Sequence, residues 1–218
     1  MIFQSILFAI GAYLVGSIPF GKIIADHVAR IDITKRGSGN IGATNVAREL
    51  GMKWGILTLV LDLMKGLAPV LLYARYSSPS GPSEDIGLAL VGLGALLGHQ
   101  FSIFLRFRGG KGVATALGVY LAICPLCCFC ALGLFLLVVA KWDFISLGSI
   151  ISGAAMPLFL ALFSRPLPLV TGSLIMALFI CFKHRDNIKR LLNGEETGWK
   201  NRRSQPSTSR SLSNSSSE

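Results

Sequence analysis

Long apolar runs alternate with short polar segments along the chain up to about residue 195. Most of these runs hold close to the roughly 20 apolar residues that an α-helix needs to cross a bilayer. The pattern therefore predicts an all-α, polytopic helical membrane protein. The apolar runs are Ile2 to about Ala25, Gly55–Tyr73, Ile86 to about Phe104, Val113–Ala140, Phe144–Phe163 and Leu167–Phe182.

The run Val113–Ala140 decides the number of spans, because its roughly 28 residues are long for one helix and short for two full ones. A single helix there would carry the basic cluster His184–Arg190 to the outer side, against the rule that cytoplasmic loops are rich in Lys and Arg. We therefore expect a short hairpin that turns near Pro125. This gives about seven transmembrane helices, with the N-terminus outside and the C-terminus cytoplasmic; five spans is the alternative count.

The first run is expected to stay in the protein as a membrane span. It has neither a basic n-region nor an Ala-x-Ala cleavage site, which a signal peptide would carry. Pro19 is expected to kink this helix. The next segment, Asp26–Lys53, is dense in cations, so we expect it on the cytoplasmic side.

Composition and charge agree with a membrane protein. Of the 218 residues 52% are hydrophobic, and the mean hydropathy is +0.60, too apolar for a typical soluble domain. The net charge of +10 lies in short segments between apolar runs and in the C-terminal tail. That placement fits anionic lipid headgroups, so no nucleic acid is expected as a partner.

The end of the chain and the cysteines lie outside this pattern. Residues 198–218 are rich in Ser, Arg and Asn, so we expect a disordered cytoplasmic tail after an integral membrane domain of residues 1–197. Four of the five cysteines share one apolar segment without His or carboxylate partners, and neither a metal site nor a cofactor is expected. They are Cys124, Cys127, Cys128 and Cys130.

The polar segment Gly98–Thr115 gathers cations and glycines between two apolar runs. Glycine N–H groups and a following helix start can bind an anion, and Lys111 adds a mobile charge, so we expect phosphate here. The spacing is not that of a Walker A loop and does not indicate ATP or GTP. A tight turn with cations among lipid headgroups is the alternative. Arg106 and Arg108 either hold a second phosphate or lie among headgroups.

A second polar segment, Gly37–Arg48, combines glycines with neutral hydrogen-bonding side chains and one arginine. The neutral side chains are Ser38, Asn40, Thr44 and Asn45. The forked guanidinium of Arg48 is suited to a phosphate. We favour this over a plain glycine-rich turn before an Asn-capped helix, because one short loop holds more donors than a turn needs.

The last polar segment begins at His184 and includes Asn187. If a helix continues out of the membrane here, His184 and Ile188 share one face. His184 is a phosphate donor, a proton carrier or an interfacial residue, and the sequence leaves this open. Glu195 is expected to pair with a neighbouring cation rather than to act as a base.

One charged pair lies inside an apolar run. Asp62 and Lys65 are three residues apart, so they share a helical face. We expect an ion pair that faces the interior of the helix bundle.

Together these segments resemble the bacterial acyl-phosphate-dependent glycerol-3-phosphate acyltransferases, which are membrane-integral. The resemblance runs from about Ile2 to Glu195. Ile41 and Ser102 stand where the family pattern has proline, which changes loop stiffness rather than chemistry. The segments that carry the resemblance are Ser38–Arg48, Gly98–Phe104, Gly109–Thr115, His184–Arg190 and Gly194–Glu195, and, more weakly, Asp62–Gly66 and Ser146–Ser149.

The resemblance implies an activity and a location. A fatty acyl group would pass from acyl phosphate to the 1-hydroxyl of glycerol 3-phosphate, giving lysophosphatidic acid and phosphate, the first step of phospholipid synthesis. The active site would face the cytoplasm at the bacterial inner membrane, among membrane lipids. An enzyme that produces acyl phosphate is a candidate partner.

Site residues follow from the motifs and from the resemblance. The residues expected to be catalytic are Lys111, His184, Arg48 and Ser38. The residues expected to bind substrate are Asn40, Thr44, Asn45, His99, Gly109, Gly110, Gly112, Ser146, Ser149 and Asn187.

We expect a direct attack without an acyl-enzyme. The sequence has no Ser-His-Asp arrangement, and it lacks the His-x-x-x-x-Asp pattern of CoA-dependent acyltransferases. Lys111, Arg48 and the glycine N–H groups would hold the two phosphates and stabilise developing charge. Ser38, His184 and Asn187 would orient glycerol 3-phosphate.

A membrane transporter of an organic phosphate is the competing function. Transporters place polar groups near the bilayer midplane, whereas most polar groups here lie at one face. Asp62 and Lys65 are the main residues that favour transport. A non-catalytic membrane scaffold is a third possibility, and three unlike polar motifs on one side argue against it.

Overall fold

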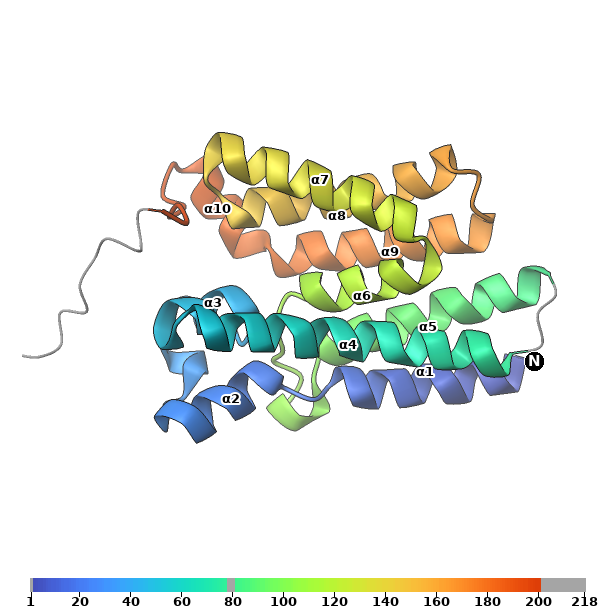
Figure 1. Cartoon of the computed structure of the whole chain (residues 1–218), viewed down its shortest axis with the longest axis horizontal. Helices are drawn as coiled ribbons and strands as arrows, with labels where there is room; N and C mark the ends of the chain where they lie inside the picture. Colours follow the sequence, from blue (N-terminus) through green and yellow to red (C-terminus); the bar gives the residue numbers. More distant parts are fainter. Residues whose placement is uncertain (1, 78–80, 201–218) are drawn as a thin grey trace, which may run out of the picture.

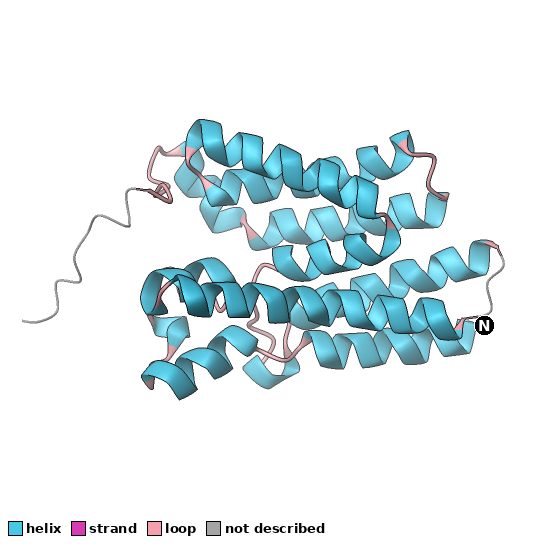
Figure 2. Ribbon diagram, in the orientation of Figure 1, coloured by secondary structure: helices cyan, strands magenta, loops and turns pink. Residues whose placement is uncertain are grey.

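The computed structural model describes residues 2–77 and 81–200, and in these ranges it contains helices and loops but no strand (Figure 2). The α-helices are α1 Ile2–Gly16, α2 Phe20–Ala29, α3 Ala43–Leu50, α4 Met52–Tyr76, α5 Pro82–Gln100, α6 Val113–Ile123, α7 Pro125–Trp142, α8 Ile145–Leu162, α9 Leu167–Lys183 and α10 Arg185–Leu192. Two 3₁₀ turns, η1 Ile33–Lys35 and η2 Ile103–Leu105, lie in the polar segments. The prediction of an all-α chain is confirmed.

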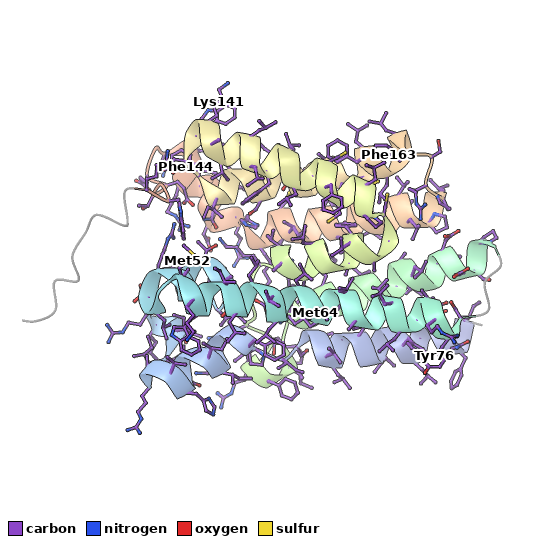
Figure 3. All side chains as sticks on the ribbon, in the orientation of Figure 1. Met52, Met64, Tyr76, Lys141, Phe144 and Phe163 are labelled. Carbon is purple, nitrogen blue, oxygen red and sulfur yellow. The ribbon has the colours of Figure 1, made fainter. Side chains whose placement is uncertain are left out.

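The long helices run back and forth between two ends of the molecule (Figure 1). Met52 and Tyr76 mark the opposite ends of α4, with Met64 between them (Figure 3). Phe144 and Phe163 likewise mark the two ends of α8 (Figure 3). The short helices α3 and α10 both lie at the left end in Figure 1, opposite the N-terminus. The polar segments that contain α3 and α10 are therefore gathered at one end.

Apolar length and lipid-facing surface together indicate a multi-pass membrane protein. Within the described residues, five helical segments are long and apolar enough to cross a bilayer, and a sixth qualifies if α9 and α10 form one bent span. The helix α6 is apolar but has only 11 residues, about 16 Å at the usual rise. Large apolar side chains such as Phe3, Leu72 and Leu137 are exposed on the outside of the bundle, where lipid would cover them.

The first span is broken at the predicted proline. Helix α1 ends at Gly16 and α2 begins at Phe20, because Pro19 has no N–H to continue the ladder. The carbonyl oxygen of Ile18 in this break accepts a hydrogen bond from Lys65 Nζ at 2.9 Å. A backbone group freed inside the bundle thus finds a side-chain partner.

The predicted turn near Pro125 is present. Helix α6 ends at Ile123, and Pro125 is the first residue of α7, the helix position where proline is favoured. Arg165, in the link between α8 and α9, donates from Nη2 to the carbonyl oxygen of Ile123 at 2.9 Å. This contact satisfies one of the open carbonyls at the end of α6.

Glycines let the central helices approach closely. A side chain at Gly98 of α5 would meet the carbonyl oxygen of Tyr13 in α1, and one at Gly66 of α4 would meet that of Thr115 in α6. Small residues allow such contacts between helices in a membrane, where van der Waals packing replaces the hydrophobic effect. The packing fixes the position of α6, and Lys111 and Gly112 immediately precede its first residue.

The ion pair predicted inside α4 is also present. Lys65 Nζ lies 2.9 Å from Asp62 Oδ1, and both side chains are buried. The pair faces the interior of the bundle as predicted.

Candidate active site

The segment before α3 is organised by the side chain of Asn45. Its Nδ2 donates to the carbonyl oxygens of Asn40 at 2.9 Å and Arg36 at 3.0 Å, and its Oδ1 accepts from the N–H of Ser38 at 3.0 Å. Asn40 Oδ1 accepts from the N–H of Gly42 at 3.1 Å. Asn45 is buried, so its hydrogen bonds shape the loop that holds Ser38, and the helix α3 that follows holds Thr44 and Arg48.

The glycine-rich segment before α6 uses its glycines differently from the expectation. The N–H groups of Gly109 and Gly110 donate to the carbonyl oxygens of Gln100 and His99, at 3.2 and 3.1 Å. They are therefore committed to the turn, and the predicted phosphate contact of these two N–H groups is not supported. Gly112 has φ +83° and precedes the first residue of α6, a conformation that glycine adopts without strain.

The third segment does not continue as one straight helix. Helix α9 ends at Lys183, and the axis bends by 61° before α10. His184 lies at the bend, where its Nδ1 is 2.8 Å from the carbonyl oxygen of Ile180. If Nδ1–H donates in this contact, Nε2 is left as the acceptor nitrogen of a neutral ring.

Lys111 and Asn187 connect the second and third segments. Lys111 Nζ donates to Asn187 Oδ1, and Gln100 Nε2 holds the Lys111 carbonyl oxygen at 2.8 Å. Residues 76 positions apart thus share one hydrogen bond. Because its partner is a neutral amide, the ammonium keeps its charge for an anion.

Glu196, which the sequence analysis did not single out, supports this contact. Its Oε1 accepts from Asn187 Nδ2 at 2.7 Å and from Ser146 Oγ at 2.6 Å, and its Oε2 accepts from Arg190 Nε at 2.8 Å. The sequence assigned cation pairing to Glu195, whereas the ion pair with Arg190 is made by Glu196. The sequence signal was a second acidic residue beside Glu195. Arg190 and Asn187 are near it in the chain, but Ser146 lies 50 positions away and could not be read from spacing.

Two groups of this network have shifted pKa values. Burial lowers the pKa of Lys111 to about 8, and nearby guanidinium groups act in the same direction, while Glu196 opposes the shift. Burial alone would raise the pKa of Glu196, but the hydrogen bonds that it accepts outweigh burial and hold its pKa below the ordinary value. At neutral pH the site therefore holds a protonated Lys111 and an ionised Glu196.

The three segments line one cavity of about 610 Å³. This volume is within the usual range for small-molecule sites. Gly109 and Gly110 are not in its wall. The predicted site residues that do line it are Ser38, Asn40, Thr44, Asn45, Arg48, His99, Lys111, Gly112, Ser146, Ser149, His184 and Asn187.

The same cavity has an extensive apolar wall. Helices α4, α6, α7 and α8 supply it, and its side chains bear no charge. They include Ile56, Leu59, Leu117, Leu132, Phe135 and Met156. A ligand that fills the cavity would thus have one cation-lined, hydrogen-bonding part and one hydrocarbon part.

The structure also places four further residues that the sequence singled out. Ser149 Oγ donates to the carbonyl oxygen of Ile145 at 2.9 Å. His99 is buried in the cavity wall, with Nδ1 3.7 Å from Asp62 Oδ1. Arg106 and Arg108 are exposed and do not line the cavity, so the prediction that they lie among headgroups is favoured over a second phosphate site.

No metal-binding arrangement is found in the described part of the chain, where no three His, Cys, Asp or Glu side chains are grouped to hold an ion. The five cysteines are free thiols. Cys128 lines the apolar part of the cavity and packs in the core.

Comparison with known proteins decides the family. The model of the glycerol-3-phosphate acyltransferase family matches residues 6–194. The chain belongs to this family. A glycerol-3-phosphate acyltransferase of Geobacter sulfurreducens is 50% identical over 200 residues, which cover 92% of this chain and 100% of the relative. One from Geotalea daltonii is 49% identical over 197 residues, covering 90% of this chain and 98% of the relative.

Two solved structures share the fold of this glycerol-3-phosphate acyltransferase family member. Both are crystal structures of PlsY (YgiH), an integral membrane glycerol 3-phosphate acyltransferase, one in the glycerol 3-phosphate form and one in the lysophosphatidic acid form. Their TM-scores are 0.84 and 0.82, each at 38% identity over 89% of this chain and 94% of the other. The arrangement of helices around the cavity is therefore a family fold.

Proposed function

We propose that this protein transfers a fatty acyl group from acyl phosphate to the 1-hydroxyl of glycerol 3-phosphate, releasing lysophosphatidic acid and phosphate. The observation that carries the proposal is that one cavity is lined by Lys111, Arg48 and His184 in one part and by apolar side chains in the other. Both substrates bring a phosphate to cations, and the donor also brings a chain that requires apolar surface. Family membership supports the same reaction.

The proposed chemistry is one displacement at the acyl carbon. The 1-hydroxyl oxygen forms a bond to the carbonyl carbon, the bond from that carbon to the phosphate oxygen breaks, and phosphate leaves with the electron pair. The hydroxyl proton passes to His184 Nε2 or to a phosphate oxygen. Because phosphate is a good leaving group, the step needs no covalent intermediate with the protein.

Lys111 and Arg48 would hold the phosphates and stabilise the charge that grows on the leaving group. The hydrogen bond from Lys111 to Asn187 and the support of Asn187 by Glu196 would fix the ammonium in advance. Such preorganised charges stabilise a transition state without reorganisation cost. Gly112 would bring backbone close to the same phosphates.

Ser38, His184 and Asn187 would orient glycerol 3-phosphate by hydrogen bonds. The contact of His184 Nδ1 with the Ile180 carbonyl would fix the ring, and Nε2 would then face a hydroxyl as an acceptor. His184→Ala separates the two roles of this residue. Loss of turnover favours a base, whereas a raised KM with unchanged kcat favours binding alone.

We place the cavity at the cytoplasmic face of a bacterial inner membrane, with seven spans, the N-terminus outside and the C-terminus inside. The seven spans are α1 with α2, α4, α5, the short α6, α7, α8 and α9. The cation-rich segments around α3 and α10 support this orientation.

The integral membrane domain would end near residue 197. Of the predicted tail, only residues 198–200 are described, and 201–218 lie outside the described residues. An enzyme that makes acyl phosphate would approach the same face.

The direct test supplies purified protein in lipid nanodiscs with labelled glycerol 3-phosphate and either palmitoyl phosphate or palmitoyl-CoA. The proposal predicts lysophosphatidic acid from palmitoyl phosphate and little or none from palmitoyl-CoA. Product from palmitoyl-CoA alone would overturn the donor. A folded preparation that makes no product from either donor would overturn the reaction, and uptake of glycerol 3-phosphate into liposomes would then support transport.

A further inference from the structure

Residues Glu195–Lys200, here called the C-terminal strap, lie against the cavity after α10. Glu196, Thr197 and Trp199 of the strap line the cavity. The family model ends at residue 194, and the sequence pattern gave the strap no function apart from the expected pairing of Glu195. The strap therefore adds residues to the site from outside the recognised motifs.

Asp143, in the link between α7 and α8, ties the strap down. Its carbonyl oxygen accepts from the N–H of Trp199 at 2.9 Å, and its Oδ2 accepts from the N–H of Lys200 at 3.1 Å. Figure 1 shows the chain after α10 beside this link. A side chain at Gly198 would clash with Asp143 Oδ2. The strap is therefore packed closely against the link between α7 and α8.

The indole of Trp199 contacts the guanidinium of Arg48. The Arg48 Cζ atom lies 5.6 Å from the centre of the Trp199 ring, within the range of a cation–π interaction. Arg48 comes from the last turn of α3, far from the strap in sequence. The contact therefore links the first polar segment to the end of the chain, across the cavity that both line.

We propose that Trp199 is a positioning residue that holds Arg48 in place for a substrate phosphate. An arginine side chain has many rotamers, and ordering them costs free energy when a ligand binds. An aromatic ring attracts the charge of the guanidinium without requiring a hydrogen-bond acceptor, so it orders the cation. The inference rests on the proposed function, because it assigns Arg48 a substrate phosphate.

The binding of glycerol 3-phosphate should depend on the contact between Trp199 and Arg48 more than the binding of the acyl donor does. Glycerol 3-phosphate is polar throughout, so its affinity comes from the cation-lined part of the cavity alone. Acyl phosphate also buries its chain against the apolar wall, and that contact does not depend on Trp199. A disordered Arg48 should therefore raise the KM for glycerol 3-phosphate more than that for acyl phosphate.

The test compares Trp199→Ala, Trp199→Phe and the wild type in nanodiscs. Trp199→Ala should raise the KM for glycerol 3-phosphate roughly three- to tenfold with a smaller change in kcat. Trp199→Phe should recover most of the loss, because phenylalanine keeps a π face. Trp142→Ala is the matched control, since Trp142 pairs with Lys141, lies outside the cavity lining and should leave both constants unchanged.

A second variant tests the anchor. Asp143 has φ +62°, so Asp143→Gly removes the carboxylate without backbone strain. It should raise the same KM, and the double variant with Trp199→Ala should be no worse than the more affected single variant, because both act through one strap. Additive losses would overturn the shared route.

The outcomes separate this inference from the proposed function. Wild-type protein that makes no lysophosphatidic acid from either donor would remove the reaction itself. Active wild type with unchanged KM in Trp199→Ala would overturn the positioning role alone. A loss in Trp199→Ala that follows a lowered melting temperature, and that Trp199→Phe does not recover, would also overturn it and leave a merely structural tryptophan.

Discussion

Lys65 is fully buried and Lys111 is half-buried in the same protein, and their partners give them opposite uses. Lys65 is buried, 2.9 Å from the Asp62 carboxylate, and donates to the Ile18 carbonyl oxygen. Its charge is neutralised and its donors are largely used. Lys111 lies on the cavity wall and donates to the neutral amide of Asn187. The comparison teaches that the partner, as well as burial, decides whether a lysine remains available to an anionic substrate.

The largest difference should appear when each lysine is replaced by methionine. Lys111→Met should lower kcat/KM for lysophosphatidic acid formation by about 10²–10³, because one preorganised charge is removed from the transition state. Its melting temperature should stay within a few degrees of the wild type, since the residue left behind, Asn187, is uncharged. Rates in nanodiscs and thermal unfolding in the same preparation check this. A Lys111→Met variant that is both unfolded and inactive would show that Lys111 has a structural role, as Lys65 does.

Lys65→Met should act on stability. It leaves the Asp62 carboxylate buried without its cation, which costs about 3–5 kcal/mol. The double variant Lys65→Met with Asp62→Leu should unfold at a higher temperature than Lys65→Met alone, because the uncompensated charge is gone. The Ile18 carbonyl oxygen keeps the hydrogen bond from the N–H of Phe20 but still loses the one from Lys65, so recovery should be partial. Equal melting temperatures for single and double variants would contradict the ion-pair account.

The pH profile sharpens the comparison. The pKa of Lys111 is about 8, below the ordinary lysine value, so the ammonium is charged well below pH 8 and loses its proton as pH rises through 8. The kcat/KM for glycerol 3-phosphate should therefore fall above about pH 8, since this ratio reports groups of the free protein. Lys111→Arg, weaker but always charged, should lose this alkaline limb. An unchanged limb in Lys111→Arg would assign it to another group.

The smallest effect is expected for the exposed cations near the same loop. Arg106→Ala and Arg108→Ala should each change kcat/KM by less than about twofold in nanodiscs of neutral lipid, because neither side chain lines the cavity. Membrane association with anionic lipid is where these cations should matter. A tenfold loss of activity in neutral lipid would show that the cavity extends to them.

Local chemistry made many features of the fold and of the site predictable from the sequence. The break at Pro19 and the turn near Pro125 follow from proline geometry, and the Asp62–Lys65 pair follows from helical spacing. The gathering of the three polar segments follows from span parity and from the placement of cations. These are short-range patterns or rules of topology, so no tertiary information was needed.

The remaining features depend on contacts between distant parts of the chain. The bend at His184 has no proline or glycine to mark it, and the partners of Glu196 come from α8 and α10. The pattern of glycines alone did not show that the N–H groups of Gly109 and Gly110 donate to carbonyl oxygens at the end of α5. The contact of Trp199 with Arg48 joins segments about 150 residues apart, a pairing that spacing rules do not reach.

The most direct test of the central claim is the rate of lysophosphatidic acid formation from palmitoyl phosphate and glycerol 3-phosphate, measured for the wild type and Lys111→Met in matched nanodiscs. The account predicts product from the wild type and a loss of at least about 100-fold in Lys111→Met with unchanged unfolding. A folded Lys111→Met variant that keeps more than about a tenth of the wild-type kcat/KM would contradict it, since that corresponds to only about 1.4 kcal/mol of transition-state stabilisation.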